Sequence, residues 1–192
     1  MTHFNKLVQI VIKVCGRFRD YLRGMILFII IVLCGGKCCG IPRVGKSVVF
    51  KYPPHKGLCI GKKCDIGPFC IFDVPPGGEL RIGDNVKLTA GVVLSSINKI
   101  IIGDNCLLAE WVSIRDAQHE FRANSPISSQ GLSSAPIVLE SDVWVGRSGL
   151  ISQGAYLEKG CIVGAHGLVK RERLQSYGIY VGIPVKKIGQ RT

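Results

Sequence analysis

The stretch LESDVWVGRSGLISQGAYLEKGCIVGAHGLV, residues 139–169, carries a large aliphatic residue at every sixth position. The members of this series are Leu139, Val145, Ile151, Leu157, Val163 and Val169. An α-helix repeats every 3.6 residues and a simple strand every two, so neither explains a strict period of six. A hexapeptide period is typical of a parallel β-helix, in which three hexapeptides form one triangular coil of about 18 residues.

The same period runs through the chain from residue 58 onward. Earlier sets with this spacing are Ile60, Ile66 and Phe72, then Ile82, Leu88 and Leu94, then Ile102, Leu108 and Ile114. Many units have a second, smaller residue two positions earlier: Cys64, Cys70, Cys106, Gly149, Ala155, Cys161 and Gly167. A β-sandwich would alternate polar and apolar residues without holding one phase over six units. We therefore expect an all-β chain whose aliphatic residues point into a β-helix.

The cysteines fit this interpretation as packing residues. The chain has nine of them, an odd number, with no CxxC pair and no spacing typical of a metal site. Four of the nine occupy the small inward position, where a free thiol behaves as a small hydrophobe. We expect no disulfide framework and no metal, and a reducing, cytoplasmic compartment.

The net charge of +12 is concentrated near the N-terminus. Residues 1–57 hold ten Lys and Arg against one acid, whereas residues 58–192 hold fifteen against twelve. A nucleic-acid-binding protein would need a basic face on its folded body, so we expect no nucleic-acid partner.

Residues 1–41 form a separate basic and apolar segment with helical spacing. The run MILFIIIVLC, residues 25–34, is too short for a confident membrane span, which needs about 20 residues. The cations before it are Lys6, Lys13, Arg17, Arg19 and Arg23. Two interpretations stay open: peripheral contact of residues 1–35 with an anionic inner membrane, or a helical cap over the first coil.

The period is interrupted after SIRDAQHEF, residues 113–121, and resumes near residue 137. Flat coil walls present few reactive groups, so a functional loop must be extruded from them. We expect residues 115–136 to form that loop, with His119 at its root beside Asp116 and Glu120.

The pattern resembles the hexapeptide-repeat acyltransferases, and among them the bacterial O-acetyltransferases of sugars and surface polysaccharides. The resemblance covers residues 58–189, and its most specific stretches are IGDNCLLAEWVSIRDAQH (102–119), SDVWVG (141–146), VGAHGLVKRE (163–172) and VGIPVKKIG (181–189). It implies a left-handed β-helix over residues 42–192 with a C-terminal tail, a homotrimer with sites between subunits, and acetyl-CoA as co-substrate.

The resemblance also assigns roles at the break. His119 matches the general base of the family, a role that suits an imidazole at neutral pH. Asp116 or Glu120 could orient the ring, and the sequence does not choose between them. The residues expected to contact the acceptor sugar are Arg115, Glu120 and Trp144, although Trp144 could equally pack in a subunit interface.

The donor-binding residues are expected beyond the break. Small residues would let the pantetheine arm approach the backbone, and cations would hold the phosphates. By resemblance, these residues are Arg147, Gly164, Ala165, Gly167, Lys170, Arg171 and Lys186. His166 departs from the family pattern, which has Gly there, and the sequence gives it no role.

The sequence thus predicts an acetyl-CoA-dependent O-acetyltransferase of a sugar hydroxyl in a polysaccharide, capsule or lipopolysaccharide precursor. A small-molecule acetyltransferase acting on an amino sugar, amino acid or antibiotic is the alternative enzyme. A noncatalytic, membrane-bound β-helix scaffold is the alternative from another class.

Overall fold

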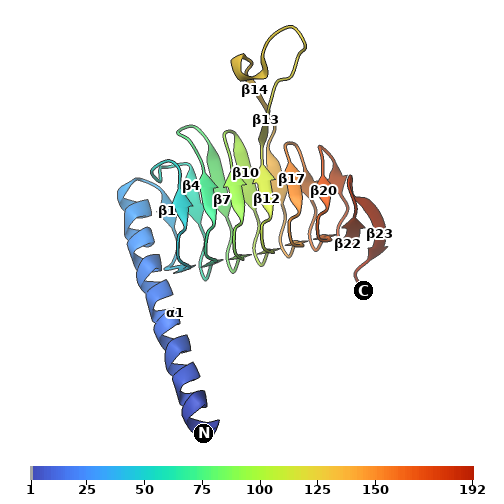
Figure 1. Ribbon diagram of the computed structural model, residues 1–192. Helices are drawn as coiled ribbons and strands as arrows, with labels where there is room; N and C mark the ends of the chain where they lie inside the picture. The colour runs from blue at the N-terminus through green and yellow to red at the C-terminus, as the bar shows by residue number, and fades with distance from the viewer. Residues whose placement is uncertain (1) are drawn as a thin grey trace.

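The computed structural model describes residues 2–192, with the side chains of residues 2–7, 10 and 11, Lys6 among them, outside the description. One long helix, α1 (Thr2–Leu33), precedes a stack of triangular coils, and a hairpin projects from one edge of the stack (Figure 1).

Three sheets form the walls of the stack, and each of the first six coils contributes one strand to each wall; the strands are parallel except for β23, which pairs antiparallel with β22. Sheet A contains β1 (Lys37–Cys38), β4 (Leu58–Ile60), β7 (Glu79–Ile82), β10 (Lys99–Ile102), β15 (Ile137–Leu139), β18 (Tyr156–Leu157) and β21 (Arg173–Leu174). Sheet B contains β2 (Arg43–Val44), β5 (Asp65–Ile66), β8 (Lys87–Leu88), β11 (Leu107–Leu108), β16 (Trp144–Val145), β19 (Ile162–Val163), β22 (Gly178–Val181) and β23 (Lys186–Gln190). Sheet C contains β3 (Val49–Phe50), β6 (Ile71–Asp73), β9 (Val93–Ser95), β12 (Ser113–Arg115), β17 (Leu150–Ser152) and β20 (Leu168–Val169).

The aliphatic residues of the six-residue period fill the interior, as the sequence predicts. All fifteen positions of the four sets are buried, and so are the seven smaller residues two positions before them. Strand register stacks like on like: Leu108 pairs with Leu88 on one side and Val145 on the other. Burial of this continuous column makes each coil stable only beside its neighbours.

The four inward cysteines are Cys64, Cys70, Cys106 and Cys161. Burial raises the pKa of each thiol from 9.0 to about 11. The thiols donate to backbone carbonyls of the adjacent coil, such as Cys106 Sγ to the Glu140 oxygen at 3.1 Å. A protonated, buried thiol is a packing group and a poor nucleophile.

The three corners of the triangle differ in length. The turns from sheet A to B and from sheet B to C keep nearly the same length in successive coils. The turn from sheet C to sheet A, here called the C/A corner, is longest between β12 and β15, and it is longer between β3 and β4 and between β6 and β7 than in the other coils. The projecting hairpin leaves the stack at this corner (Figure 1).

The C-terminal half of α1 covers the N-terminal end of the stack. Leu27 and Ile31 are buried in the main core, and Gly24 lies so close to the first coil that an added Cβ would sit 1.8 Å from the Pro42 oxygen. The helix ends at Leu33 and the first coil begins at Lys37, a few residues before the expected boundary at 42. Within residues 2–192, no helix is long and apolar enough to cross a membrane.

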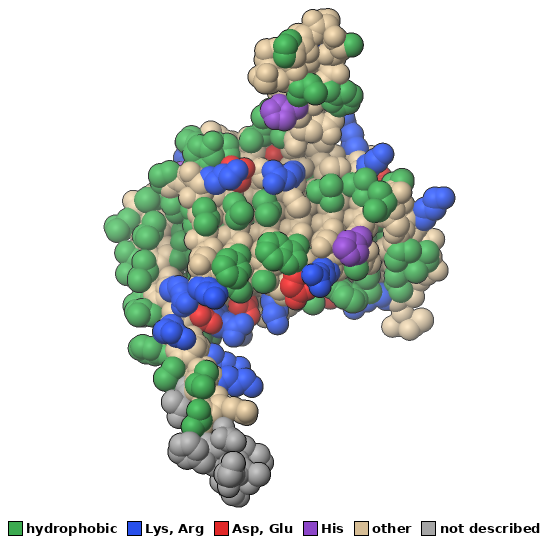
Figure 2. All heavy atoms as spheres, in the orientation of Figure 1, with side chains coloured by type: hydrophobic (Ala, Val, Ile, Leu, Met, Phe, Trp, Pro, Cys, Tyr) green, Lys and Arg blue, Asp and Glu red, His purple; other side chains and the backbone are tan. Residues whose placement is uncertain are grey.

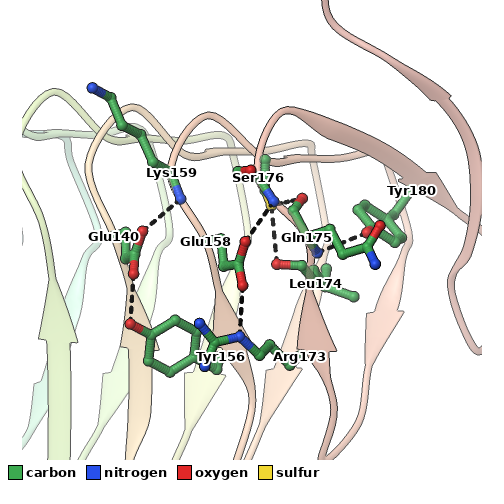
Figure 3. Close-up of polar contacts among 10 residues, drawn as sticks. Glu140, Tyr156, Glu158, Lys159, Arg173, Leu174, Gln175, Ser176 and Tyr180 are labelled. Atoms are coloured by element: carbon green, nitrogen blue, oxygen red, sulfur yellow. Dashed lines mark hydrogen bonds and ion pairs between the residues drawn. The ribbon is translucent and has the colours of Figure 1, made fainter.

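The outer face of sheet A is polar near the C-terminal end (Figure 3). The Tyr156 hydroxyl donates to Glu140, and the Arg173 Nε donates to Glu158 at 2.6 Å. The hydrogen bond to Glu140 raises the pKa of the Tyr156 phenol, and the Arg173 guanidinium lowers the pKa of Glu158. These pairs join neighbouring coils on a hydrated wall.

Candidate active site

The break in the repeat forms a β-hairpin where the sequence predicts a loop. β13 (Ala117–His119) pairs antiparallel with β14 (Leu132–Ser134), and His119 lies opposite Leu132 at the end of the ladder. The tip contains a short 3-10 helix, η1 (Ile127–Ser129). The Gln130 side chain closes the tip: its Oε1 accepts from the Arg122 backbone N–H at 2.7 Å, and its Nε2 donates to the Arg122 backbone oxygen at 2.9 Å. His119 is therefore held on a strand, with its side chain exposed to solvent.

The hairpin is braced by the coils on both sides of it. Asn98 Nδ2 donates to Ser134 Oγ at 3.3 Å from the preceding coil. Gln153 Nε2 donates to Ser133 Oγ at 3.1 Å from the following coil. Sequence reasoning missed these two positioning residues, and the only signal would have been polar side chains at the corners flanking the break.

Asp116 has a different environment from the one the sequence suggests. Its side chain is fully buried, and its Oδ1 accepts from the Ile97 backbone N–H at 2.9 Å. Its Oδ2 accepts from Ser96 Oγ at 2.8 Å and from the Asn98 N–H at 2.9 Å. The carboxylate thus holds the C/A corner of the preceding coil, and its hydrogen bonds go to Ser96, Ile97 and Asn98 and not to His119.

Glu120 and Arg115 lie on either side of the buried aspartate. The Glu120 backbone N–H donates to the Gly131 oxygen at 2.9 Å, which continues the hairpin, and its side chain is half-buried. Arg115 ends β12 with an exposed side chain whose Nε donates to Ser113 Oγ at 3.1 Å. Glu120 follows His119 in the sequence, and no hydrogen bond joins their side chains in the described part of the chain.

Lys170 and Arg171 lie at the same corner as the hairpin. Their turn follows β20, two coils beyond the turn that contains His119, or about 10 Å along the stack at the usual strand spacing. The Arg171 side chain passes over Gly154, where an added Cβ would meet its Cγ at 2.6 Å. Among the ion pairs of the described side chains, neither cation has a partner, whereas Arg173 pairs with Glu158 and Arg191 with Asp142.

The other expected donor-binding residues gather at the turn from sheet B to sheet C. The His166 N–H donates to the Arg147 oxygen at 2.8 Å, which stacks the two turns. Gly167 is buried, and an added Cβ would lie 2.7 Å from Val163 Cγ1, so packing accounts for this glycine. Ala165 and His166 are exposed, and His166 takes the left-handed region with φ +58.

Lys186 and Gly164 complete this second group. Lys186 begins β23 and pairs with Val181 at the end of the stack, while the Gly164 N–H donates to the Tyr180 oxygen at 2.8 Å. An added Cβ at Gly164 would meet Val181 Cγ1 at 2.8 Å.

Sheet C joins the two groups. Its strands span about 10 Å between the corners, given their length of two or three residues. Leu150 and Leu168 stand in one outward row, with Ser113 beside Leu150 in the preceding coil. In the described chain, His119, Lys170 and Arg171 therefore lie along one edge of sheet C. The turns of residues 146–149 and 164–167 lie along its other edge.

Trp144 lies on a different wall. Its ring is exposed on sheet B, as expected for the residue before an inward Val145, and it borders a cavity of about 310 Å³ shared with Leu107, Ile162 and Arg191. Sheet B faces away from the hairpin corner, so one chain does not bring Trp144 and His119 together. The described residues also contain no cluster of His, Cys, Asp and Glu that could hold a metal ion.

Comparison with curated proteins identifies sequence relatives over most of the repeat. No family model matches the chain. The chain is 35% identical over 154 residues to a protein of Mycobacterium tuberculosis named as a probable acetyltransferase, Rv3034c, covering 79% of this chain and 51% of that protein. It is 30% identical over 119 residues to WbbJ of Escherichia coli, named for lipopolysaccharide biosynthesis and O-acetyl transfer, covering 58% of this chain and 60% of WbbJ. The chain thus spans about half to three fifths of these relatives.

Solved structures share the fold. A mutant of AntD, an N-acyltransferase from Bacillus cereus in complex with dTDP and coenzyme A, superposes with a TM-score of 0.71 at 24% identity, covering 81% of this chain and 84% of AntD. A maltose O-acetyltransferase from Clostridium difficile superposes with a TM-score of 0.55 at 19% identity, covering 81% of this chain and 66% of that one. The chain is a left-handed parallel β-helix, and its resemblance to the hexapeptide-repeat acyltransferases is confirmed.

Proposed function

We propose that this chain is an acetyl-CoA-dependent O-acetyltransferase that acts on a sugar hydroxyl in a polysaccharide, capsule or lipopolysaccharide precursor. The observation that carries the proposal is the placement of His119. It is the exposed histidine on the hairpin that interrupts the repeat, and two neighbouring coils brace that hairpin.

His119 supplies the proton transfer that the reaction needs. A sugar hydroxyl is a weak nucleophile, and removing its proton during attack lowers the barrier. The neutral imidazole accepts that proton as the hydroxyl oxygen bonds to the thioester carbonyl carbon. The carbon–sulfur bond then breaks, and the imidazolium returns the proton to the departing thiolate, so the products are an acetyl ester and free coenzyme A.

The donor would lie along sheet C. Lys170 and Arg171 at the C/A corner, and Lys186 with Arg147 across the wall, are exposed and make no ion pair among the described side chains. Ammonium and guanidinium groups of this kind suit the phosphates of coenzyme A. The outward Leu150 and Leu168 offer an apolar strip between the two groups.

The relatives support a sugar acceptor and leave its nucleophile open. WbbJ and the maltose O-acetyltransferase are named for transfer to oxygen, whereas AntD is named for transfer to nitrogen. A second candidate is therefore transfer to the amine of an amino sugar. An unprotonated amine is a better nucleophile than a hydroxyl and depends less on a general base.

A homotrimer would complete the site. Trp144 and His119 lie on different walls of one chain, so a site using both needs a second subunit. The outward row Leu107, Trp144 and Ile162 on sheet B is apolar, as expected for an interface core.

His119→Ala tests the catalytic assignment. We expect the variant to stay folded, because the side chain is exposed, and to lose about 10²–10⁴-fold in kcat. Activity of the parent should rise with pH as the general base loses its proton, and the variant should lose that limb of the profile.

The control is Gln118→Ala, one residue earlier on the same strand, which probes damage to the hairpin without removing a base. Products from nucleotide sugars with and without an amino group, identified by mass spectrometry after reaction with labelled acetyl-CoA, separate O-transfer from N-transfer. A folded His119→Ala protein with parental kcat on every acceptor would refute the role of His119.

A further inference from the structure

The outer side of α1 carries a continuous apolar face that the β-helix does not cover. Residues three or four apart lie on one face of a helix. On the side turned to the first coil, this spacing runs through Asp20, Gly24, Leu27 and Ile31, of which the last three are buried. On the opposite side, it runs through Val14, Phe18, Leu22, Met25, Ile29 and Leu33.

All six side chains of this outer face are exposed. Phe18 is 70% exposed and Leu33 is 81% exposed. The face extends over the 20 residues from 14 to 33, which corresponds to about 30 Å of helix. Hydrophobic side chains line the outer edge of α1 in Figure 2. An apolar strip of this length on a surface is an interaction site, because scattered single side chains would need no explanation.

Cations lie on both flanks of this face, at Arg17 and Arg19, and on the side of the helix turned to the body. Lys13, Arg17, Arg19 and Arg23 belong to the same helix, whose one acid, Asp20, pairs with Arg23 at 3.3 Å. Lys and Arg side chains also gather where the helix meets the body (Figure 2).

At that junction, a cavity of about 740 Å³ between α1 and the first coils carries further positive charge. Its basic lining residues are Arg17, Arg43, Lys62, Lys63 and Lys87. Asp65 pairs with Arg43 and leaves the remaining cations in excess.

These charges select the occupant of the apolar face. A second copy of α1 would bring the same positive edges together, so like charges would oppose the contact. Anionic lipid headgroups would instead neutralise the edges while the apolar face enters the acyl boundary. Because α1 is not apolar enough to span, it would lie in the plane of the surface.

We propose that α1 docks the protein on an anionic lipid bilayer with its outer face in the membrane and the β-helix standing on the cap. The proposal combines the two interpretations of the N-terminal segment. Leu27 and Ile31 cap the first coil, and the opposite side of the same helix binds lipid. The proposal does not depend on the acetyltransferase activity.

The test measures co-sedimentation of the full chain with vesicles of phosphatidylcholine alone and of phosphatidylcholine with phosphatidylglycerol. The outer-face variant is Phe18→Gln, Leu22→Gln and Ile29→Gln, which leaves the capping residues intact. The matched control places three glutamines at exposed apolar positions of the body: Phe121, Ile127 and Ile188.

We expect the parent and the control to bind phosphatidylglycerol vesicles, and the outer-face variant to bind at least tenfold more weakly. Binding should fall with added salt and be at least tenfold weaker on phosphatidylcholine alone. Circular dichroism and thermal melting identify any variant that fails to fold, and the single substitution Phe18→Gln in the full chain then repeats the comparison. Equal vesicle binding by the parent and the outer-face variant overturns the proposal. A loss of oligomer size in that variant without a loss of vesicle binding overturns it too and assigns the face to a second copy.

Discussion

Replacing Asp116 separates a positioning role from a catalytic one. The carboxylate is fully buried and accepts three hydrogen bonds, from Ser96 Oγ and from the backbone N–H groups of Ile97 and Asn98, at 2.8 to 2.9 Å. Asp116→Ala would leave all three donors without an acceptor. Asp116→Asn keeps the volume and one acceptor oxygen, but turns an amide N–H₂ toward at least one donor.

The expected cost follows from these contacts. A hydrogen bond to a charged group contributes about 1.5–3 kcal/mol, but bonds that share one carboxylate are not additive. Each buried donor left without an acceptor costs about 1–3 kcal/mol, and because the three share one site we expect a total loss of about 3–5 kcal/mol of unfolding free energy for Asp116→Ala. At about 2–4 °C per kcal/mol for a domain of this size, the melting temperature should fall by roughly 6–20 °C. Asp116→Asn should lose about half as much.

The assay combines thermal melting with a pH–rate profile. A positioning role predicts that Asp116→Asn melts earlier and loses some kcat, because the root of the hairpin shifts, while the rate limb assigned to the imidazole stays at the same pH. Ser96→Ala removes one of the three bonds and serves as the graded control. The reasoning fails if Asp116→Asn keeps the parental melting temperature and moves the rate limb, because that result would mean that the carboxylate acts on His119.

Two further predictions concern the cations and the thiols. Replacing Lys170, Arg171 and Lys186 with Gln should raise the KM for acetyl-CoA at least tenfold, because one charged hydrogen bond contributes about 1.5–3 kcal/mol, and should leave the acceptor KM nearly unchanged. Steady-state kinetics measure both KM values, and the same change at Lys62, Lys63 and Lys87 is the control. An unaltered KM for acetyl-CoA would contradict the assignment. The exposed thiols, such as Cys15 and Cys39, should react rapidly with a thiol reagent at pH 8, while the four inward cysteines react only after unfolding. Because burial raises the pKa of these inward thiols from 9.0 to about 11, the folded chain holds their protons more tightly than the unfolded chain does. The contribution of these thiols to the free energy of unfolding is therefore complete below about pH 9 and is lost between pH 9 and 11. Rapid labelling of the four inward cysteines in the folded chain would show that they are not packed inside.

The sequence predicts the core of the β-helix because one physical requirement repeats in every coil. An inward position such as Leu108 must be large and apolar, and the position two before it, Cys106, must be small, so the pattern is visible without a structure. The first coil was harder to recognise, because Cys38 and Val44 show the period over two units only and Phe50 is partly exposed. α1 received two interpretations because its helical spacing does not say which side meets the body.

The candidate site is less predictable, because it consists of single residues whose partners are distant in the sequence. His119 could be chosen from its place at the break and from the family resemblance. Asp116 looked equally suited to catalysis, and only the positions of Ser96 and Asn98, about 20 residues earlier, show that its oxygens are already occupied. Gln153 braces the hairpin from the next coil, and its sequence position carries no signal for that contact.

The regular stacking of the coils converts sequence position into height above the capping helix. The hairpin leaves the fourth coil, three steps from the first, or about 14 Å at the usual strand spacing. The capping helix adds roughly 10 Å. If α1 lies on a lipid surface, His119 would stand at the root of the hairpin roughly 25 Å above it. An acceptor sugar carried on a lipid would need a linker or glycan that spans this distance. The number of coils before the break would then set the minimum distance between the lipid and the acceptor hydroxyl.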